Sequence, residues 1–304
     1  MYKRFFVSIV SISCLISIFF ILIAYLFSGS LSNPTSRIVD EHKKIAQNIK
    51  TSKVLVISGS NTLFGINTEL MSKKLNYPVI NFGSNAGLRL DYIFYDAKKS
   101  IRDNDIVILP LEYGIYREDK LSNNRIIQIC NDKEYLNELT LIDRLSFLYA
   151  VPFIIELKAI CAFKDDLNYE NTNEHGDIIN KVGTKNTIYL KEPFRKEYTY
   201  MDTGTRETII DFLSYCKEKN VKVFVTYPAY YYKQNYFDGY NLEQINKINQ
   251  FWMEQDVTIL GKYTDFIYID KNDFYDTEYH LNIKGKEKRT EKLIELLKPY
   301  IDNN

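Results

Sequence analysis

The sequence has few of the residues from which disulfide frameworks and metal sites are built. It contains four cysteines and three histidines in 304 residues. A disulfide scaffold needs a higher density of cysteine, and metal sites that recruit imidazole need clustered histidines. We therefore expect neither, and we expect no metal ion and no cofactor. If the chain is exported, Cys130 and Cys161 are the candidate pair for a single disulfide, and Cys216 is expected to pack as a small apolar residue.

An excess of charge is missing as well. The chain has 39 lysine and arginine residues and 39 aspartate and glutamate residues. Nucleic-acid-binding proteins usually present a basic surface that neutralises phosphates, so this balance argues against a nucleic-acid partner. Neither a P-loop nor a G-x-G-x-x-G motif is present, which weighs against a phosphate-binding flavodoxin-like protein. Hydrophobic residues make up 45% of the chain, as is usual for a globular protein with a core.

One long apolar run stands near the start of the chain. Residues from Phe5 to Phe27 include no charge, glycine or proline. At about 1.5 Å per residue, such a helix crosses a hydrocarbon core of about 30 Å. Lys3 and Arg4 precede the run, and the positive-inside rule places them in the cytosol. We therefore expect residues 1–30 to form a single-pass membrane anchor, with the rest of the chain outside the cytoplasm.

A cleaved signal peptide is the alternative interpretation of this run. Its apolar region would be shorter, at about 7–15 residues, and small residues would mark the cleavage site. This run ends instead in the bulky residues Tyr25, Leu26 and Phe27. Residues 31–51 are expected to form a short polar tether and an amphipathic helix, with His42 in solvent. His175 lies in a polar segment and is also expected to be solvated.

From residue 52 onward, short apolar runs alternate with helical stretches. Five continuous apolar strands separated by helices are typical of a parallel sheet covered on both faces. Right-handed crossovers then give a three-layer, doubly wound α/β fold. Residues 52–304 are expected to form this domain, with an insertion at about 115–200 that includes a helix at 143–163. The strands are predicted at 53–58, 77–81, 105–111, 221–227 and 265–270.

Chemically useful residues follow the first and second predicted strands. Open parallel sheets bind ligands beyond the carboxyl ends of their strands. Ser60 follows Gly59 after the first strand, where a nucleophile could stand before a helix. Gly83 and Gly87 follow the second strand, where backbone N–H groups could form an oxyanion hole.

A third group follows the last predicted strand. His280 lies four residues after Asp276 and two after Glu278. A histidine near carboxylates can act as a base that an acid orients. The tyrosines of residues 227–232 follow the fourth strand, where they could stack on a sugar or simply pack.

These stretches resemble sequence blocks of the SGNH (GDSL-like) hydrolase superfamily. Ser58-Gly-Ser-Asn-Thr-Leu-Phe-Gly-Ile66 resembles the first block of its membrane-anchored members, residues 81–87 resemble the second, and residues 279–285 resemble the fifth. The resemblance covers about residues 53–301 without the insertion. It implies the flavodoxin-like SGNH fold. It also implies that Ser60 is the nucleophile, that His280 is the catalytic histidine, and that the N–H groups of Ser60 and of Ala86 or Gly87 form the oxyanion hole.

The sequence departs from this family pattern in three places. Where the third block should bring G-x-N-D, the chain has Leu109-Pro-Leu-Glu-Tyr-Gly114, so Glu112 occupies the place of the asparagine. The acid is expected three residues before the histidine, where Thr277 stands; Asp276 is preferred and Glu278 is the alternative. The first block lacks its usual aspartate at Gly59. Further candidates for lining the site are Asn61, Gly83, Asn85, Glu112 and Glu278.

The resemblance implies an extracytoplasmic serine-dependent esterase or O-acyltransferase. Its expected substrate is a cell-surface polysaccharide or glycolipid, and a membrane-bound acyltransferase is an expected partner. The alternative is a catalytically inactive SGNH-like module that binds glycan or scaffolds a polysaccharide-assembly complex. The missing asparagine favours this alternative, and the Ser60 and His280 pair disfavours it.

Overall fold

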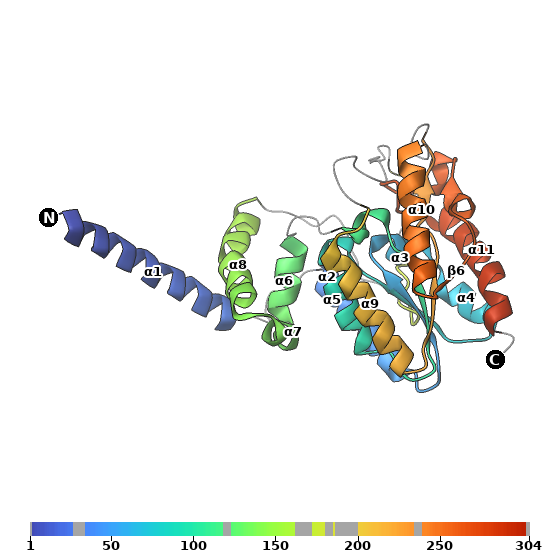
Figure 1. The fold of residues 1–304 in the computed structure, drawn as a ribbon, viewed down its shortest axis with the longest axis horizontal. Helices are drawn as coiled ribbons and strands as arrows, with labels where there is room; N and C mark the ends of the chain where they lie inside the picture. The colour runs from blue at the N-terminus through green and yellow to red at the C-terminus, as the bar shows by residue number, and fades with distance from the viewer. Residues whose placement is uncertain are drawn as a thin grey trace. The chain divides into compact units, whose positions relative to one another are not determined.

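A computed structural model (Figure 1) describes residues 2–26, 34–117, 123–161, 172–179, 185, 200–233 and 239–301. By its internal contacts the chain divides into two compact units. The first comprises residues 1–37 and 121–168, and the second comprises residues 38–120 and 169–304. The candidate site residues named above all belong to the second unit.

The described part of the first unit is helical. It contains α1 (Tyr2–Leu26), α6 (Asn123–Asn131), α7 (Lys133–Glu138) and α8 (Leu141–Cys161). Helix α8 packs against both α1 and α6. It confirms the helix predicted at 143–163 up to residue 161, after which the described residues end. Helix α1 is long and apolar enough to cross a membrane by length and composition.

The second unit is built on a five-stranded parallel sheet in the order β2-β1-β3-β4-β6. Its strands are β1 (Val54–Ser58), β2 (Val79–Gly83), β3 (Ile106–Leu109), β4 (Lys222–Val225) and β6 (Thr258–Ile259). Every residue of β1, β2 and β3 is buried. Both faces of these strands are covered, which is why their sequences are continuous apolar runs. The predicted α/β fold with a five-stranded parallel sheet is confirmed.

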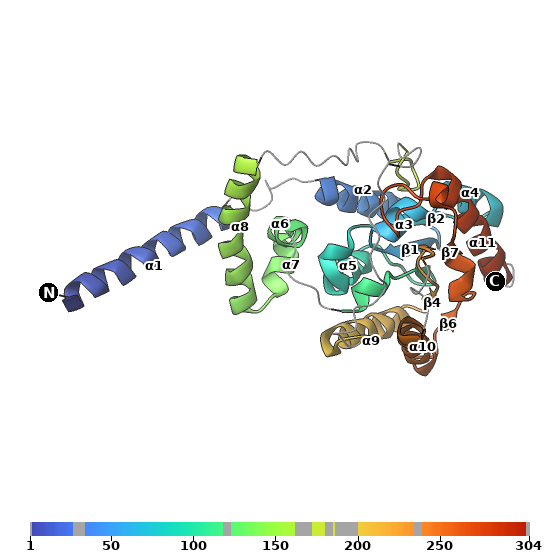
Figure 2. The same cartoon turned by 90° about the horizontal axis from the view of Figure 1, so that it is seen from above.

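Helices cover the two faces of this sheet. On one face, α11 (Ile283–Ile301) packs against α3 (Ser60–Gly65) and α4 (Thr68–Leu75). On the other face, α5 (Arg89–Lys98) packs against α9 (Thr203–Glu218), with the rings of Phe94 and Phe212 stacked at 4.0 Å. Figure 2 shows α2 (Pro34–Asn48) on the same side as α5. Helix α10 (Gly239–Glu254) packs against β6.

The predicted fifth strand is wrong. Residues 265–270 do not join the main sheet; they include the end of the 3-10 helix η3 (Tyr263–Phe266) and the short strand β7 (Ile267–Tyr268). Strand β7 pairs with β5 (Tyr230–Tyr231) in a separate sheet. The edge position beside β4 belongs to β6, which has two residues between the left-handed positions Asp256 and Gly261. A strand this short carries no periodic apolar signal.

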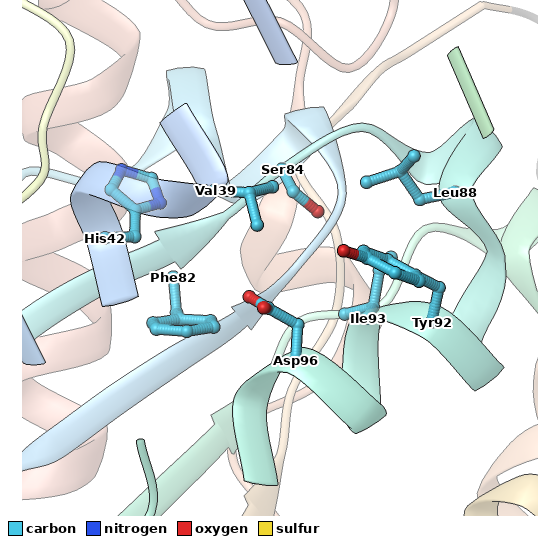
Figure 3. Close-up of a pocket in the computed structure, with 8 residues that line it drawn as sticks. All are labelled: Val39, His42, Phe82, Ser84, Leu88, Tyr92, Ile93 and Asp96. Atoms are coloured by element: carbon cyan, nitrogen blue, oxygen red, sulfur yellow. The ribbon is translucent and has the colours of Figure 1, made fainter. Parts of the chain in front are cut away.

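The expectation that His42 lies in solvent is also wrong. Residues Ile38, His42 and Ala46 are spaced by four, so they share the face of α2 that packs on the domain, and all three are buried. The Nε2 atom of His42 lies 2.8 Å from the carbonyl oxygen of Gly176. Burial lowers the pKa of His42. Figure 3 shows this histidine in a small pocket between α2, β2 and α5.

One further expectation on a single residue is corrected, and two cysteines are placed. His175 is half-buried, and its Nδ1 lies 3.1 Å from the carbonyl oxygen of Val79 and 3.3 Å from Ser72 Oγ. It therefore anchors its segment to β2 rather than lying free in solvent. Cys130 is a free, buried thiol whose pKa is raised to about 12 by burial, and the side chain of Cys161, its expected disulfide partner, lies outside the part of the chain whose side chains the structure describes. Cys216 is buried on α9, as expected.

Candidate active site

Ser60 lies at the carboxyl end of β1, as the first residue of α3. Gly59 joins the strand to the helix in a crowded turn. A Cβ atom at Gly59 would lie 2.6 Å from Glu112 Oε1 and 2.7 Å from the backbone nitrogen of Ala86. Only glycine allows the ends of β1, β2 and β3 to approach so closely, and the turn thereby presents Ser60 at the switch point of the sheet.

Ser60, His280 and Asp276 form a continuous hydrogen-bonded relay. His280 Nε2 lies 2.8 Å from Ser60 Oγ, and His280 Nδ1 lies 2.7 Å from Asp276 Oδ1. Both contacts are satisfied when Nδ1–H donates to the carboxylate and the serine hydroxyl donates to Nε2. Because both ring nitrogens are then occupied, the geometry favours Asp276 over Glu278 as the residue that orients the imidazole.

The segment from Phe274 to Leu281 holds this histidine in place. Its two ends form an antiparallel bridge. The Tyr275 N–H donates to the carbonyl of His280 at 2.8 Å, and the His280 N–H donates to Thr277 Oγ1 at 3.2 Å. The Phe64 ring of α3 packs against the imidazole with ring centres 4.5 Å apart. Thr277 occupies the position where the family pattern expects the acid. Its hydroxyl oxygen instead helps to position His280, because it accepts the backbone N–H of that histidine.

Two backbone N–H groups are available to bind an oxyanion, those of Ser60 and Ala86. The N–H groups of Ser60 and Ala86 donate to no other residue that the structure describes. By contrast, the Gly87 N–H donates to Asn85 Oδ1 at 2.8 Å. Of the two predicted alternatives for the second donor, the structure therefore favours Ala86. Asn85 caps the 3-10 helix η1 (Ala86–Leu88) and fixes the direction of this loop.

Glu112 stands at the end of β3 and binds the turn that carries Ser60. Its Oε2 accepts from Ser58 Oγ at 2.5 Å and from the Gly59 N–H at 3.2 Å, and its Oε1 accepts from the Asn61 N–H at 2.8 Å. An ionised carboxylate is an acceptor only, so Glu112 offers no N–H to an oxyanion, as an asparagine would. It acts instead as a positioning residue.

The structure reveals a buried cation that sequence reasoning missed. Arg289 of α11 is fully buried, and its Nη1 donates to the carbonyl of Asn61 at 2.9 Å while its Nη2 donates to the carbonyl of Tyr227 at 3.2 Å. Burial lowers its pKa to about 10, so it remains charged at neutral pH. Through the carbonyl of Asn61, Arg289 holds α3 in place. A single arginine on the apolar face of a helix, four residues from Gly285 and Leu293, is the only signal that the sequence carries for it.

The remaining predicted site residues lie around the relay in supporting roles. Asn61 is buried, and its Nδ2 donates to the carbonyls of Ala229 and Tyr279 at 3.1 and 3.2 Å. Gly83 packs against the backbone of Leu63. Glu278 is buried, and its carbonyl accepts from the Tyr231 N–H at 3.0 Å. None of these residues lines the cleft beside Ser60.

That cleft has a volume of about 180 Å³. Its lining residues are Ser60, Ala86, Gly87, Arg89, Glu112, Gly114, Ile115, Arg117 and Tyr279. Burial raises the pKa of Tyr279 well above its ordinary value, so this phenol stays neutral. Tyr230 is buried edge-to-face against the Tyr279 ring at 4.8 Å; it packs behind the cleft and is not exposed for stacking on a sugar.

No metal-binding group emerges from the described ranges. No three His, Cys, Asp or Glu side chains in the part of the chain that the structure covers could hold a metal ion together. Hydrogen-bonded contacts such as those of Ser60, His280 and Asp276 allow a proton to pass to and from an imidazole. The arrangement can therefore support attack by an activated hydroxyl on a carbonyl carbon.

Comparison with known proteins identifies no family. No family model and no curated protein matches the chain. Among solved structures, the crystal structure of protein YxiM from Bacillus subtilis is similar, with a TM-score of 0.37 and 12% sequence identity. The match covers 82% of this chain and 57% of that one, so the chain spans little more than half the length of YxiM.

Proposed function

We propose that this protein is a serine-dependent esterase or O-acyltransferase of the SGNH type. The observation that supports it most is the relay from Asp276 through His280 to Ser60, with contacts of 2.7 and 2.8 Å. Ser60 follows the carboxyl end of β1, which lies inside the parallel sheet. A nucleophile, a base and an orienting acid in hydrogen-bond reach of one another are the constellation that acyl transfer requires.

The first half of the reaction transfers the acyl group to Ser60. As Ser60 Oγ attacks the ester carbonyl carbon, His280 Nε2 takes the hydroxyl proton, and Asp276 stabilises the imidazolium that forms. The N–H groups of Ser60 and Ala86 bind the oxyanion of the tetrahedral intermediate. When this intermediate collapses, the ester C–O bond breaks, and His280 returns the proton to the leaving alcohol. The product is an acyl-serine.

The second half of the reaction regenerates the enzyme. A water molecule or an acceptor hydroxyl donates its proton to His280 Nε2 and attacks the acyl-serine carbonyl. Collapse releases a carboxylic acid in hydrolysis or a new ester in transfer, and the proton returns to Ser60. The cleft of about 180 Å³ has room for a short acyl group and part of an acceptor.

We place this chemistry outside the cytoplasm, on a surface polysaccharide or glycolipid. The apolar helix α1, with Lys3 and Arg4 at its start, supports an anchor with its N-terminus in the cytosol. An anchored acyl-transferring domain works at the membrane surface, where a membrane-bound acyltransferase could supply acyl groups and envelope glycans offer hydroxyls.

One observation favours a second candidate, a catalytically inactive module that binds glycan or scaffolds an assembly complex. Glu112 places a buried carboxylate beside the turn that carries the oxyanion donor Ser60. A negative charge there opposes the developing oxyanion. The Glu112 carboxylate, however, already accepts hydrogen bonds from three donors, which is why we rank the enzyme first.

A kinetic cycle tests the enzyme proposal with the full chain in non-ionic detergent. Ser60→Ala, His280→Ala and the double variant are assayed on 4-nitrophenyl acetate, with Ser84→Ala as the control serine of the neighbouring strand end. Because Ser60 and His280 act as a unit, each single substitution should remove nearly as much activity as both together. Activity that survives in Ser60→Ala at the wild-type level would refute the proposal.

A further inference from the structure

The carboxylate of Asp276 meets a second basic group besides the imidazole of His280. Its Oδ1 lies 2.7 Å from His280 Nδ1, and its Oδ2 lies 3.8 Å from the ammonium nitrogen of Lys185. One oxygen therefore faces the imidazole, and the other faces a lysine. A carboxylate that is attracted at both oxygens has less freedom to turn, so Lys185 helps to fix the direction in which Asp276 presents Oδ1 to the histidine.

Lys185 also contacts the segment that carries the histidine. It belongs to the predicted insertion, far from Asp276 along the chain. Its backbone N–H donates to the carbonyl of Tyr275 at 2.7 Å, and its Nζ lies 5.1 Å from the centre of the Tyr275 ring. The N–H of Tyr275 in turn donates to the carbonyl of His280 at 2.8 Å. The main chain and the side chain of Lys185 thus both meet the segment that holds the base.

The exposure of these side chains sets how strongly the charge of the lysine acts. The side chains of Asp276 and His280 are 15% and 16% exposed, whereas that of Lys185 is 45% exposed. A charge acts more strongly on groups that are mostly removed from water, so the ammonium group influences the carboxylate and the imidazole behind it. Because solvent reaches Lys185 itself, this influence is screened and we expect a modest effect.

The other groups around His280 do not alter this comparison. From α3, the Ser60 hydroxyl and the Phe64 ring face the imidazole, and neither is charged. From its own segment, Asp276 faces it. Other charged residues at this end of the sheet are Glu112, Glu278, Arg89 and Arg117. They are the same in every variant below, so their influence cancels when a variant is compared with wild type.

We propose that Lys185 is a positioning residue of the relay, which orients the Asp276 carboxylate and makes His280 release its proton at a lower pH. The imidazolium is stabilised by the opposite charge of Asp276 and destabilised by the like charge of Lys185. Only a neutral imidazole can take the hydroxyl proton of Ser60, so the lysine extends the working range of the base toward lower pH. The effect on turnover rests on the proposed function, whereas the effect on the proton of His280 does not.

The pH dependence of turnover tests this role in the full chain in non-ionic detergent, with 4-nitrophenyl acetate as substrate. In Lys185→Met, the acid limb of kcat/KM should move to higher pH by about half a unit. Lys185→Glu reverses the charge and should move the limb further. The plateau of kcat/KM should fall about threefold in both variants, because the carboxylate loses a contact that orients it. Lys185→Arg keeps the charge and should follow wild type.

A second lysine provides the matched control. Lys284 of α11 is 57% exposed and lies 2.9 Å from Asp270, an aspartate outside the relay. Lys284→Met should therefore overlay wild type across the whole pH range. Thermal melts of all variants check the fold, and the exposed side chain of Lys185 can be replaced without opening a cavity in the core. A lower plateau with an unmoved acid limb in both Lys185→Met and Lys185→Glu would make the lysine merely structural and would overturn the inference.

Nuclear magnetic resonance reads the proton of His280 without any turnover. The chain contains three histidines, so carbon-13 labelling of histidine gives three ring signals, and His280→Gln identifies the one that belongs to His280. In the full chain without substrate, the midpoint of its titration should move to higher pH by about half a unit in Lys185→Met, and Lys284→Met should leave it in place. This shift in a chain that hydrolyses no ester would sink the enzyme and keep the role of Lys185. A midpoint that is unchanged in Lys185→Met and in Lys185→Glu would overturn that role whatever the turnover.

Discussion

The carboxylate of Asp276 lies 2.7 Å from Nδ1 of His280, while the other ring nitrogen contacts Ser60 Oγ at 2.8 Å. The side chain that orients the imidazole is thus four residues before the histidine rather than three. Thr277 occupies the intervening position and accepts the His280 N–H. The backbone turn that displaces the acid by one residue also fixes the histidine.

Asp276→Asn should reduce turnover by about 10³–10⁴-fold while leaving the fold intact. The amide cannot stabilise the imidazolium, and it allows the wrong tautomer. Steady-state kinetics on 4-nitrophenyl acetate measures the loss, and a thermal melt checks the fold. Glu278→Gln is the matched control and should keep most of the activity. If Glu278→Gln caused the loss and Asp276→Asn did not, the acid would be wrongly assigned.

Glu112→Gln should destabilise the domain and slow the reaction together. Three donors now bind the Glu112 carboxylate. In the glutamine variant the amide N–H₂ would face one of them, so that two donors would meet without an acceptor, and an unsatisfied buried polar group costs about 1–3 kcal/mol of stability. The Ser60 turn should loosen as a result. A thermal melt and steady-state kinetics follow the two effects, with the exposed Glu287→Gln as control.

The same variant separates the two candidate functions. If the charge of Glu112 mainly suppresses chemistry at Ser60, as in the inactive module, its removal should raise activity. A faster reaction in Glu112→Gln would therefore contradict the positioning role that we assign to this residue.

His42 should make the stability of the domain depend on pH. Because burial lowers the pKa of folded His42, the unfolded chain takes up a proton near pH 6.5, where the folded chain does not. The stabilising contribution is present above that pH and is lost as the pH falls below it, by at most about 1.4 kcal/mol per pH unit. Melts from pH 7.5 to 5.5 should show a flatter pH dependence in His42→Gln than in wild type. Identical slopes would exclude this role.

The orientation of α1 is testable with a reporter. We propose that Lys3 and Arg4 retain the N-terminus in the cytosol; alkaline phosphatase fused after residue 304 should then be active, and a cytosolic fluorescent protein fused there should not fluoresce. The chain should stay in the membrane fraction with its N-terminus intact. Replacing both residues with glutamate should lower the correctly oriented fraction. Release of a soluble form that starts near residue 28 would contradict the anchor.

Sequence patterns predict the centre of the sheet, and which side chains lie beside it, better than they predict its edge. The strands β1, β2 and β3 are continuous apolar runs, and short motifs follow them. These patterns were enough to predict that Ser60 and Ala86 lie at one edge of the sheet. No local pattern could reveal β6, because two residues between left-handed turns leave no period. The prediction therefore missed β6 and wrongly placed the last strand of the main sheet at residues 265–270.

Burial of polar side chains was the other part that the sequence did not reveal. His42 lies among charged neighbours on α2 and Arg289 lies on the apolar face of α11, and each can be buried because a distant carbonyl accepts its hydrogen bond. The carbonyls belong to Gly176 for His42 and to Asn61 and Tyr227 for Arg289. Such partners are set by tertiary packing, since they lie far away along the chain. The same holds for the donors that surround Glu112.

Covalent labelling of Ser60 tests the central claim most directly. The purified full chain is treated with a serine-directed organophosphonate, and the site is read by peptide mass spectrometry. The account predicts one label, on Ser60, that disappears in His280→Ala and is retained in Ser84→Ala, because only a serine with a base 2.8 Å away is activated. A folded wild-type chain that takes no label, or that is labelled on Ser58 or Ser84 instead, would contradict it.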